Sequence, residues 1–139
     1  STLPRPAAIA VLSPWVDLTM SGESVKTRLK RDPFFAPHIQ QASHCVNAYC
    51  GSTPLTNPDV SPLFGQLEGL PPLLIQVGSE EILFSDAQRL AEKAQKSGSE
   101  VLFSYWQGMW HVWQYLVPRM KESRMAIAEV GNFYRRYLK

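Results

Sequence analysis

Three apolar runs limit what this chain can fold into: AAIAVLSPW at 7–15, LLIQVG at 73–78 and EVLFSYWQG at 100–108. Continuous apolar runs of this length are typical of strands buried on both faces of a parallel sheet, although the third run alternates with polar residues in part. Amphipathic helical patterns follow the second run at 86–98 and the third at 118–139. Buried strands that alternate with such helices predict an α/β fold with right-handed crossovers.

The predicted sheet is small for such a fold. Three mostly parallel strands with flanking helices leave sheet edges and apolar surface that need cover from elsewhere. The first run also begins almost at residue 1 of the 139 residues. Since 45% of the residues are apolar and 19% are charged, the chain is of the globular class. We therefore expect part of a larger α/β domain, incomplete by itself.

Charge and hydropathy exclude several partners. The net charge is +2, and the basic runs KTRLKR at 26–31 and YRRYLK at 134–139 are as short as solvated helix faces usually are. We expect no nucleic-acid or membrane-surface role. No apolar run is long enough to cross a bilayer, so we expect no membrane span.

Local signals place turns and helix starts. Short helices between 24 and 50 are broken at Pro33 and Pro37, and a Pro- and Gly-rich connection fills 51–72. Ser85 and Gln88 match the S-x-x-Q capping box, which predicts that the next helix starts there. Asp86 would then lie in the first turn, where a negative charge stabilises the helix dipole.

By residue type alone, the two cysteines and a nearby histidine are candidate metal ligands. HCVNAYC brings His44, Cys45 and Cys50 together, but the spacing lacks the histidine pair or second cysteine pair of a zinc site. We expect small buried thiols on a helix and no metal.

An acid and a histidine follow neighbouring predicted strands. Glu80 and Glu81 come directly after LLIQVG, and His111 follows the third run inside GMWHVWQ. Because sites in parallel sheets form beyond the carboxyl ends of strands, one carboxylate is expected to reach the imidazole and fix its tautomer. The alternatives are a hydrogen-bonded core histidine and a solvated glutamate pair.

The residues supply no attacking group. G-x-S-x-G is absent, since the only glycines spaced by four are Gly65 and Gly69, with leucine at the centre of GQLEG. No H-G-G segment occurs either. By residue chemistry the chain holds a base and an acid without a nucleophile.

Three stretches carry a family resemblance: LPRPAAIAVLSPWVDLTMSGES at 3–24, NPDVSPLFGQLEGLPPLLIQVGSEEILFSDAQRLAEKA at 57–94 and GMWHVWQ at 108–114. In their order and spacing they resemble the carboxy-terminal half of a hormone-sensitive-lipase-like esterase of the α/β-hydrolase fold. The resemblance implies that residues 1–139 are the carboxy-terminal portion of a single α/β-hydrolase domain. It further implies that the half bearing the oxyanion segment and the nucleophile is missing.

The resemblance also implies the site. The triad acid follows the strand-ending small residue Gly78 by three positions, which selects Glu81, and the triad base after Gly-Met-x is His111. The family writes the acid stretch more often as D-P-L-x-D-E, where this chain has EILFSD, so Asp86 is the rival for the acid.

Two classes of function follow. The first is a serine esterase acting on small carboxylic esters, without cofactor or metal, to which this chain contributes acid and histidine; alone it is expected to be inactive. The second is a non-catalytic binder of small ligands on the same scaffold, since fold alone does not separate the two. The retained pair favours the enzyme. The resemblance also implies a homodimer through the strand at 100–107, and we expect a cytoplasmic protein.

Overall fold

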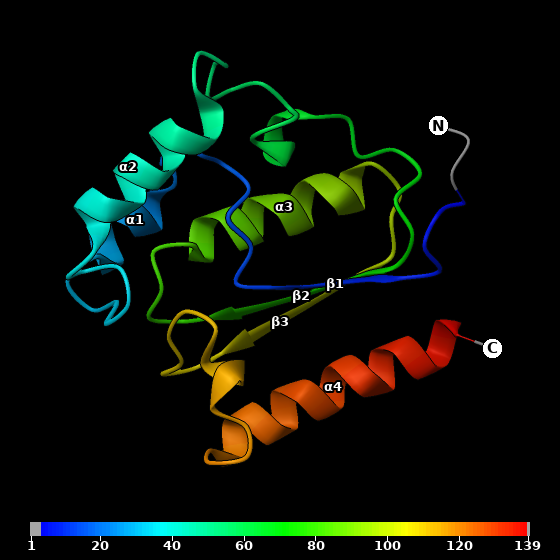
Figure 1. Cartoon of the computed structure of the whole chain (residues 1–139). Coiled ribbons are helices and arrows are strands. Elements are labelled where there is room, and N and C mark those ends of the chain that lie inside the picture. The colour runs from blue at the N-terminus through cyan, green and yellow to red at the C-terminus, as the bar shows by residue number, and fades with distance from the viewer. Residues whose placement is uncertain (1–3, 139) are drawn as a thin grey trace.

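The computed structural model describes residues 4–138. Strands β1 (Ile9–Leu12), β2 (Leu73–Gly78) and β3 (Val101–Trp106) form one parallel sheet in the order β1-β2-β3. Leu73 lies opposite both Ile9 and Val101, so β2 is the central strand. The predicted α/β class, with three parallel strands and flanking helices, is confirmed (Figure 1).

Helices cover both faces of the sheet. On one face lie α1 (Glu23–Arg28), α2 (Ile39–Cys50), α3 (Phe84–Lys96) and the short 3₁₀ helix η1 (Pro62–Phe64), while α4 (Lys121–Tyr137) covers the other (Figure 1). A second 3₁₀ helix, η2 (Trp113–Leu116), precedes α4. Within residues 4–138, no helix has both the length and the apolar character needed to cross a bilayer.

The core lies on the two faces of β2. All six residues of this strand are buried, as its continuous apolar run predicts. Ile75 and Val77 pack against the small side chains of α3, with Ala87 and Ala91 among them. Leu74 points to the opposite face and packs with Phe133 of α4.

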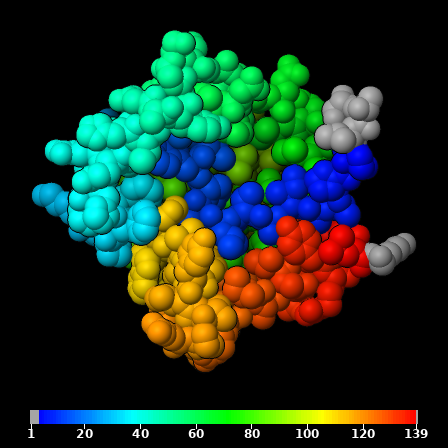
Figure 2. All heavy atoms as spheres, viewed as in Figure 1, coloured from blue at the N-terminus to red at the C-terminus, as the bar shows by residue number. Residues whose placement is uncertain are grey.

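The outer strands are less covered than β2. Every residue of β1 is only half-buried although the strand reads IAVL, and β3 exposes Leu102 and Tyr105. Figure 2 shows atoms of the first part of the chain uncovered between α2 and α4. Among the described residues, β1 and β3 each pair with β2 alone. Both outer edges therefore lack a neighbouring strand, although the Ala10 N–H of β1 donates to the Tyr134 hydroxyl of α4 at 3.1 Å.

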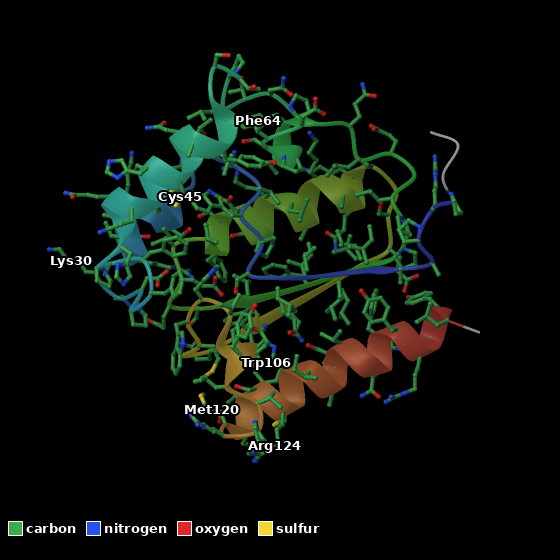
Figure 3. The ribbon with its side chains drawn as sticks, in the orientation of Figure 1. Lys30, Cys45, Phe64, Trp106, Met120 and Arg124 are labelled. Atoms are coloured by element: carbon green, nitrogen blue, oxygen red, sulfur yellow. The ribbon has the colours of Figure 1, made fainter. Side chains whose placement is uncertain are left out.

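Two local predictions are wrong. Helix α3 begins at Phe84, and Ser85 does not cap it. Instead Ser85 and Ser24 bond each other, with each hydroxyl accepting the other's backbone N–H at 2.9 Å. The Ser85 hydroxyl, which was predicted to cap the helix, is thus bonded to a residue far away in the sequence. The cysteines were expected to be buried, yet only Cys50 is; Cys45 lies exposed on α2 (Figure 3).

Candidate active site

Three loops at the carboxyl ends of the strands bring the site together. Ser13 directly follows β1, Glu81 lies three residues after β2, and His111 lies five residues after β3. Parallel strands end at the same edge of the sheet, so these loops meet there. The predicted juxtaposition of Glu81 and His111 is present.

Glu81 and His111 are in direct contact. Nδ1 of His111 lies 3.3 Å from Oε2 of Glu81. The Glu81 side chain is completely buried, whereas 15% of the His111 side chain is exposed. With its Nδ1 proton directed at the carboxylate, the neutral imidazole leaves Nε2 as an acceptor.

The second oxygen of Glu81 is fixed by two donors. Oε1 accepts the hydroxyl of Ser13 at 2.8 Å and the backbone N–H of Gly78 at 2.5 Å. Ser13 Oγ in turn accepts the N–H of Val112, next to the histidine, at 3.1 Å. The carboxylate is thereby held by the end of β2 and by the loop after β1, which in turn bonds the loop after β3. Ser13 is buried and its hydroxyl bonds the acid rather than the imidazole, so it holds the site in place.

Gly78 allows the histidine loop to approach β2. A β carbon at this position would lie 2.2 Å from the carbonyl oxygen of Met109, closer than any real contact. The same carbonyl accepts the backbone N–H of Glu80 at 3.0 Å. A glycine at the strand end is required by this close approach.

Glu80 turns away from the imidazole. Its carboxylate pairs with Arg31, with Oε2 lying 2.5 Å from Nη2, and accepts the Ser79 hydroxyl at 2.7 Å. The Ser79 hydroxyl and the Arg31 guanidinium lower the pKa of Glu80. Arg28 donates to the Ser79 carbonyl at 2.7 Å, so α1 and its following turn brace the loop that carries the acid. Of the two adjacent glutamates, only Glu81 faces His111.

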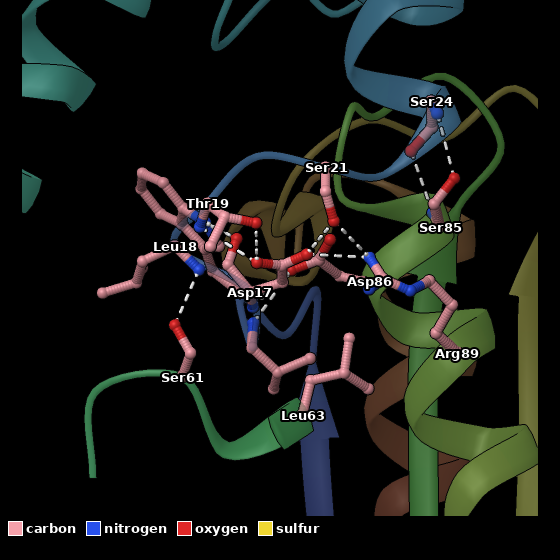
Figure 4. A network of polar contacts seen from close by, with 12 residues as sticks. Asp17, Leu18, Thr19, Ser21, Ser24, Ser61, Leu63, Ser85, Asp86 and Arg89 are labelled. Atoms are coloured by element: carbon pink, nitrogen blue, oxygen red, sulfur yellow. Dashed lines mark hydrogen bonds and ion pairs between the residues drawn. The ribbon is translucent and has the colours of Figure 1, made fainter. Parts of the chain in front are cut away.

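Asp86, the rival acid, lies in a different network (Figure 4). Its Oδ2 accepts the backbone N–H groups of Val16 and Asp17 at 3.0 and 2.9 Å. The side chain is buried, and this burial raises the pKa of Asp86 to about 6. Asp17 beside it pairs with Arg89 at 2.8 Å. Asp86 therefore ties α3 to the loop after β1, a larger structural task than the predicted stabilisation of a helix start.

Aromatic rings enclose the imidazole. The ring centroids of Phe34 and Phe35 lie 4.8 and 4.9 Å from that of His111. Trp15 contacts Phe35 edge to face at 5.8 Å. Trp15 also lines two neighbouring clefts of about 360 and 240 Å³ between α2 and the loop after β1. Trp113 is buried against Trp106, which makes it a core residue.

The other sequence candidates lie apart from this site. His38 and His44 are both exposed. Ser61 is buried, and its hydroxyl accepts the N–H of Leu18, so it caps a loop. In the part of the chain that the structure describes, three or more His, Cys, Asp or Glu side chains nowhere gather as a metal site would require.

Sequence reasoning missed several residues around the pair. Ser13 adopts φ +48°, which is unusual for serine and is not signalled by the Ser-Pro dipeptide, because a residue before proline is normally extended. Asp32 precedes Pro33, a spacing typical of a helix start, yet its buried carboxylate accepts N–H groups on both sides of the site. The aromatic pair FF at 34–35 carried no periodic signal at all.

The chemistry available here is oriented acid–base catalysis. A buried carboxylate fixes the tautomer of a partly exposed imidazole, leaving its second nitrogen to exchange a proton with a reacting group. The site lacks its own attacking atom among the described residues, since the nearby Ser13 hydroxyl is already bonded to Glu81 and Val112.

Comparisons of sequence and of structure relate the whole chain to known proteins. Residues 1–115 match the family described as the alpha/beta hydrolase fold. An acetyl-hydrolase of Streptomyces hygroscopicus is 42% identical over 95% of this chain and 44% of its own length. An esterase of Acinetobacter venetianus is 36% identical over 92% of this chain and 42% of its own length.

A solved structure gives the same relationship in three dimensions. The crystal structure of an esterase from the bacterial hormone-sensitive lipase family superposes with a TM-score of 0.93 and 38% identity, covering 99% of this chain and 46% of that one. The chain thus spans less than half the length of the proteins it matches.

Proposed function

The chain belongs to the α/β-hydrolase fold family, and from this premise we propose that it contributes the acid and the base of a serine ester hydrolase. His111 is the general base and Glu81 the acid that orients it. The attacking serine and the oxyanion donors belong to a segment outside these 139 residues. Small carboxylic esters are the substrates, and acetyl esters are the first to assay, because an acetyl-hydrolase is among the relatives.

The contact between His111 Nδ1 and Glu81 Oε2, at 3.3 Å, is the observation that carries the proposal. It leaves Nε2 to take the proton of the attacking serine as the Ser Oγ–carbon bond forms. The carboxylate stabilises the resulting imidazolium. That proton then passes to the alkoxide when the carbon–oxygen bond to the alcohol breaks. Water repeats the sequence on the acyl-enzyme, releasing the carboxylic acid and restoring the serine.

The outer edge of β1 could pair with a strand of the missing segment. β1 is an apolar strand whose four residues are only half-buried, and its outer side pairs with no strand among residues 4–138. A further parallel strand on that edge would deliver its carboxyl end to the rim that holds Ser13, Glu81 and His111. We propose this edge as the docking position of the strand that precedes the nucleophile.

The test is hydrolysis of 4-nitrophenyl acetate by the full-length protein. His111→Ala is expected to lower kcat by several orders of magnitude, because the serine loses its base. The matched control is His38→Ala, which is expected to keep wild-type activity. His38 is an exposed histidine at the N-cap position of α2. A full-length protein that binds small esters and leaves them intact would be the non-catalytic binder, and the proposal would be wrong.

A further inference from the structure

One exposed aromatic ring lies on the candidate base. Phe34 and Phe35 both contact His111, but Phe35 is 5% exposed and belongs to the core, whereas Phe34 is 48% exposed. The Phe34 ring is tilted 44° to the imidazole, with the centroids 4.8 Å apart. An exposed ring of this size in contact with a partly exposed imidazole is available to whatever approaches that imidazole.

Asp32 fixes the backbone segment that carries this ring. Its buried carboxylate accepts the backbone N–H groups of Phe34 and Phe35 through Oδ1, at 2.9 and 3.0 Å. Its other oxygen accepts the N–H of Ile82, the residue after Glu81, at 2.9 Å. One carboxylate therefore connects the aromatic turn to the acid loop. The Phe34 backbone is held in register with Glu81 and His111 although the side chain is exposed.

The reaction identifies which part of an ester meets Phe34. Nδ1 of His111 is directed at Glu81, so the proton for the departing alkoxide is delivered from Nε2. The alcohol part of the ester must then lie against the imidazole at the moment its bond to the carbonyl carbon breaks. Groups beside the imidazole on its exposed side contact that alcohol part.

We propose that Phe34 forms the wall of the site against the alcohol part of the ester and makes the enzyme selective for aryl and other large apolar alcohols. This inference rests on the proposed function and adds a specificity-determining residue to it. Aromatic ring pairs contribute beyond the apolar area they bury, so an aryl leaving group gains from the ring and a methyl group does not.

The experiment distinguishes an effect on the alcohol part of the ester from an effect on the acyl part. Phenyl acetate and methyl acetate form the same acetyl-enzyme, so a difference in kcat/KM between them arises in the steps up to and including departure of the alcohol. Phenyl acetate and phenyl butyrate share the alcohol and differ only in the acyl group. All three are assayed with the full-length wild type, Phe34→Ala, Phe34→Leu and Phe34→Tyr.

We expect Phe34→Ala to reduce the preference for phenyl over methyl acetate by about fivefold to tenfold, the size of an aromatic contact. Phe34→Leu should reduce it in part, and Phe34→Tyr should retain it because the ring remains. The ratio between phenyl acetate and phenyl butyrate should stay within about twofold of the wild type, since the acyl part does not meet this wall. Phe64→Ala, which truncates an exposed phenylalanine on η1 (labelled in Figure 3), is the matched control and should change neither ratio.

Four outcomes would overturn the inference. Equal losses for phenyl and methyl acetate would mean that Phe34 only supports His111. A changed acetate-to-butyrate ratio would place Phe34 on the acyl side. A wild type that hydrolyses none of the esters would overturn the proposed function as well, whereas an active wild type with unchanged selectivity in Phe34→Ala would overturn this inference alone.

Discussion

The α carbon of Gly78 and the carbonyl of Met109 lie so close that the histidine loop rests on the bare backbone of the β2 end. A β carbon at Gly78 would reach within 2.2 Å of that carbonyl oxygen and 2.5 Å of its carbon. Both atoms are backbone, so no side chain can rotate away. The position of His111 relative to Glu81 therefore depends on a residue that has no side chain.

Gly78→Ala is expected to displace the loop at 109–111 and to lower kcat by at least about a hundredfold, since displacing a catalytic group by about 1 Å has this cost. Overpacking should also lower the free energy of unfolding by about 1–3 kcal/mol. Kinetics and denaturant unfolding of the full-length protein measure both. Gly131→Ala is the control: its β carbon would meet only the Arg135 guanidinium at 3.7 Å, and replacing a helix-interior glycine should leave stability equal or higher. Wild-type kinetics in Gly78→Ala would contradict the steric argument.

Glu81→Gln is expected to lower kcat by orders of magnitude with the fold intact, because an amide no longer stabilises the imidazolium. The neighbouring substitution Glu80→Gln should cost at most about tenfold, since Glu80 pairs with Arg31 instead of His111. Initial rates with a saturating ester distinguish the two variants. If Asp86→Asn abolished activity while Glu81→Gln remained active, Asp86 would be the acid.

Ser13→Ala removes one of the two donors to Glu81 Oε1 and the acceptor of the Val112 N–H. We expect kcat to fall by about tenfold with KM unchanged, because a hydrogen bond to a charged group has been lost from the orienting acid. Ser61→Ala deletes an equally buried hydroxyl that bonds only Leu18 among the described residues, so it should affect stability and leave kcat unchanged. Equal kinetic effects of the two substitutions would refute an orienting role for Ser13.

Asp86 gives the protein a pH-dependent stability of defined sign. Burial raises its pKa from 3.8 to about 6, so the folded state binds this proton more tightly than the unfolded state. Its contribution to the free energy of unfolding is therefore full below about pH 4 and lost as the pH rises through about 6, a loss of about 3 kcal/mol. Asp86→Asn should abolish that part of the pH dependence.

The neighbouring charges determine the range in which this is measured. Burial raises the pKa of Asp17, but hydrogen bonds from Ser21, Thr19 and Arg89 outweigh it and leave the pKa lowered. The contribution of Asp17 is thus lost as the pH falls below its ordinary value. Unfolding of the full-length wild type and variant should be compared between about pH 4.5 and 7. A wild type and a variant with parallel curves over this range would contradict the assignment to Asp86.

Residues 1–139 expressed alone are expected to hydrolyse 4-nitrophenyl acetate no faster than buffer does, because the proposed attacking serine lies outside them. If residues 1–139 alone hydrolysed this ester, and if His111→Ala abolished that activity, the chain would carry its own nucleophile. In the full-length protein, amide exchange at Leu12 of β1 should be slow, because a strand on the open edge would accept this N–H. Ala10 does not test the edge, since its N–H already donates to the Tyr134 hydroxyl at 3.1 Å. Rapid exchange at Leu12 would contradict a paired edge.

Apolar periodicity predicted most of the fold. LLIQVG is β2 to the residue, and the predicted helices at 86–98 and 118–139 correspond to α3 and α4 with ends shifted by a few residues. The spacing of apolar residues along the chain determines these elements, because it specifies which face of each helix or strand is buried. β1 is shorter than its apolar run because Ser13 turns the chain at positive φ, and no apolar pattern encodes such a turn.

The site was predictable only where residues follow strands. The glutamate pair at 80–81 could be placed beside His111 because parallel strands end at one edge, and the family resemblance selected Glu81 from the pair. The residues that hold them could not, since Ser13, Asp32 and Phe34 act through contacts between segments far apart in the chain. The capping box at Ser85 failed for the same reason: Ser24 competes for its hydroxyl, and sequence spacing does not reveal the competitor.

The parallel pairing of β1 with β2 also orders the events of folding. β2, α3 and β3 are consecutive in the chain, whereas joining Ile9 to Leu73 closes a loop of about sixty residues and incurs its entropy before any contact is formed. The β2–α3–β3 unit should nucleate folding, with high φ-values at Ile75 and low ones at Val11. Ser13 would then reach Glu81 late, so the acid would remain hydrated until the last strand closes over it.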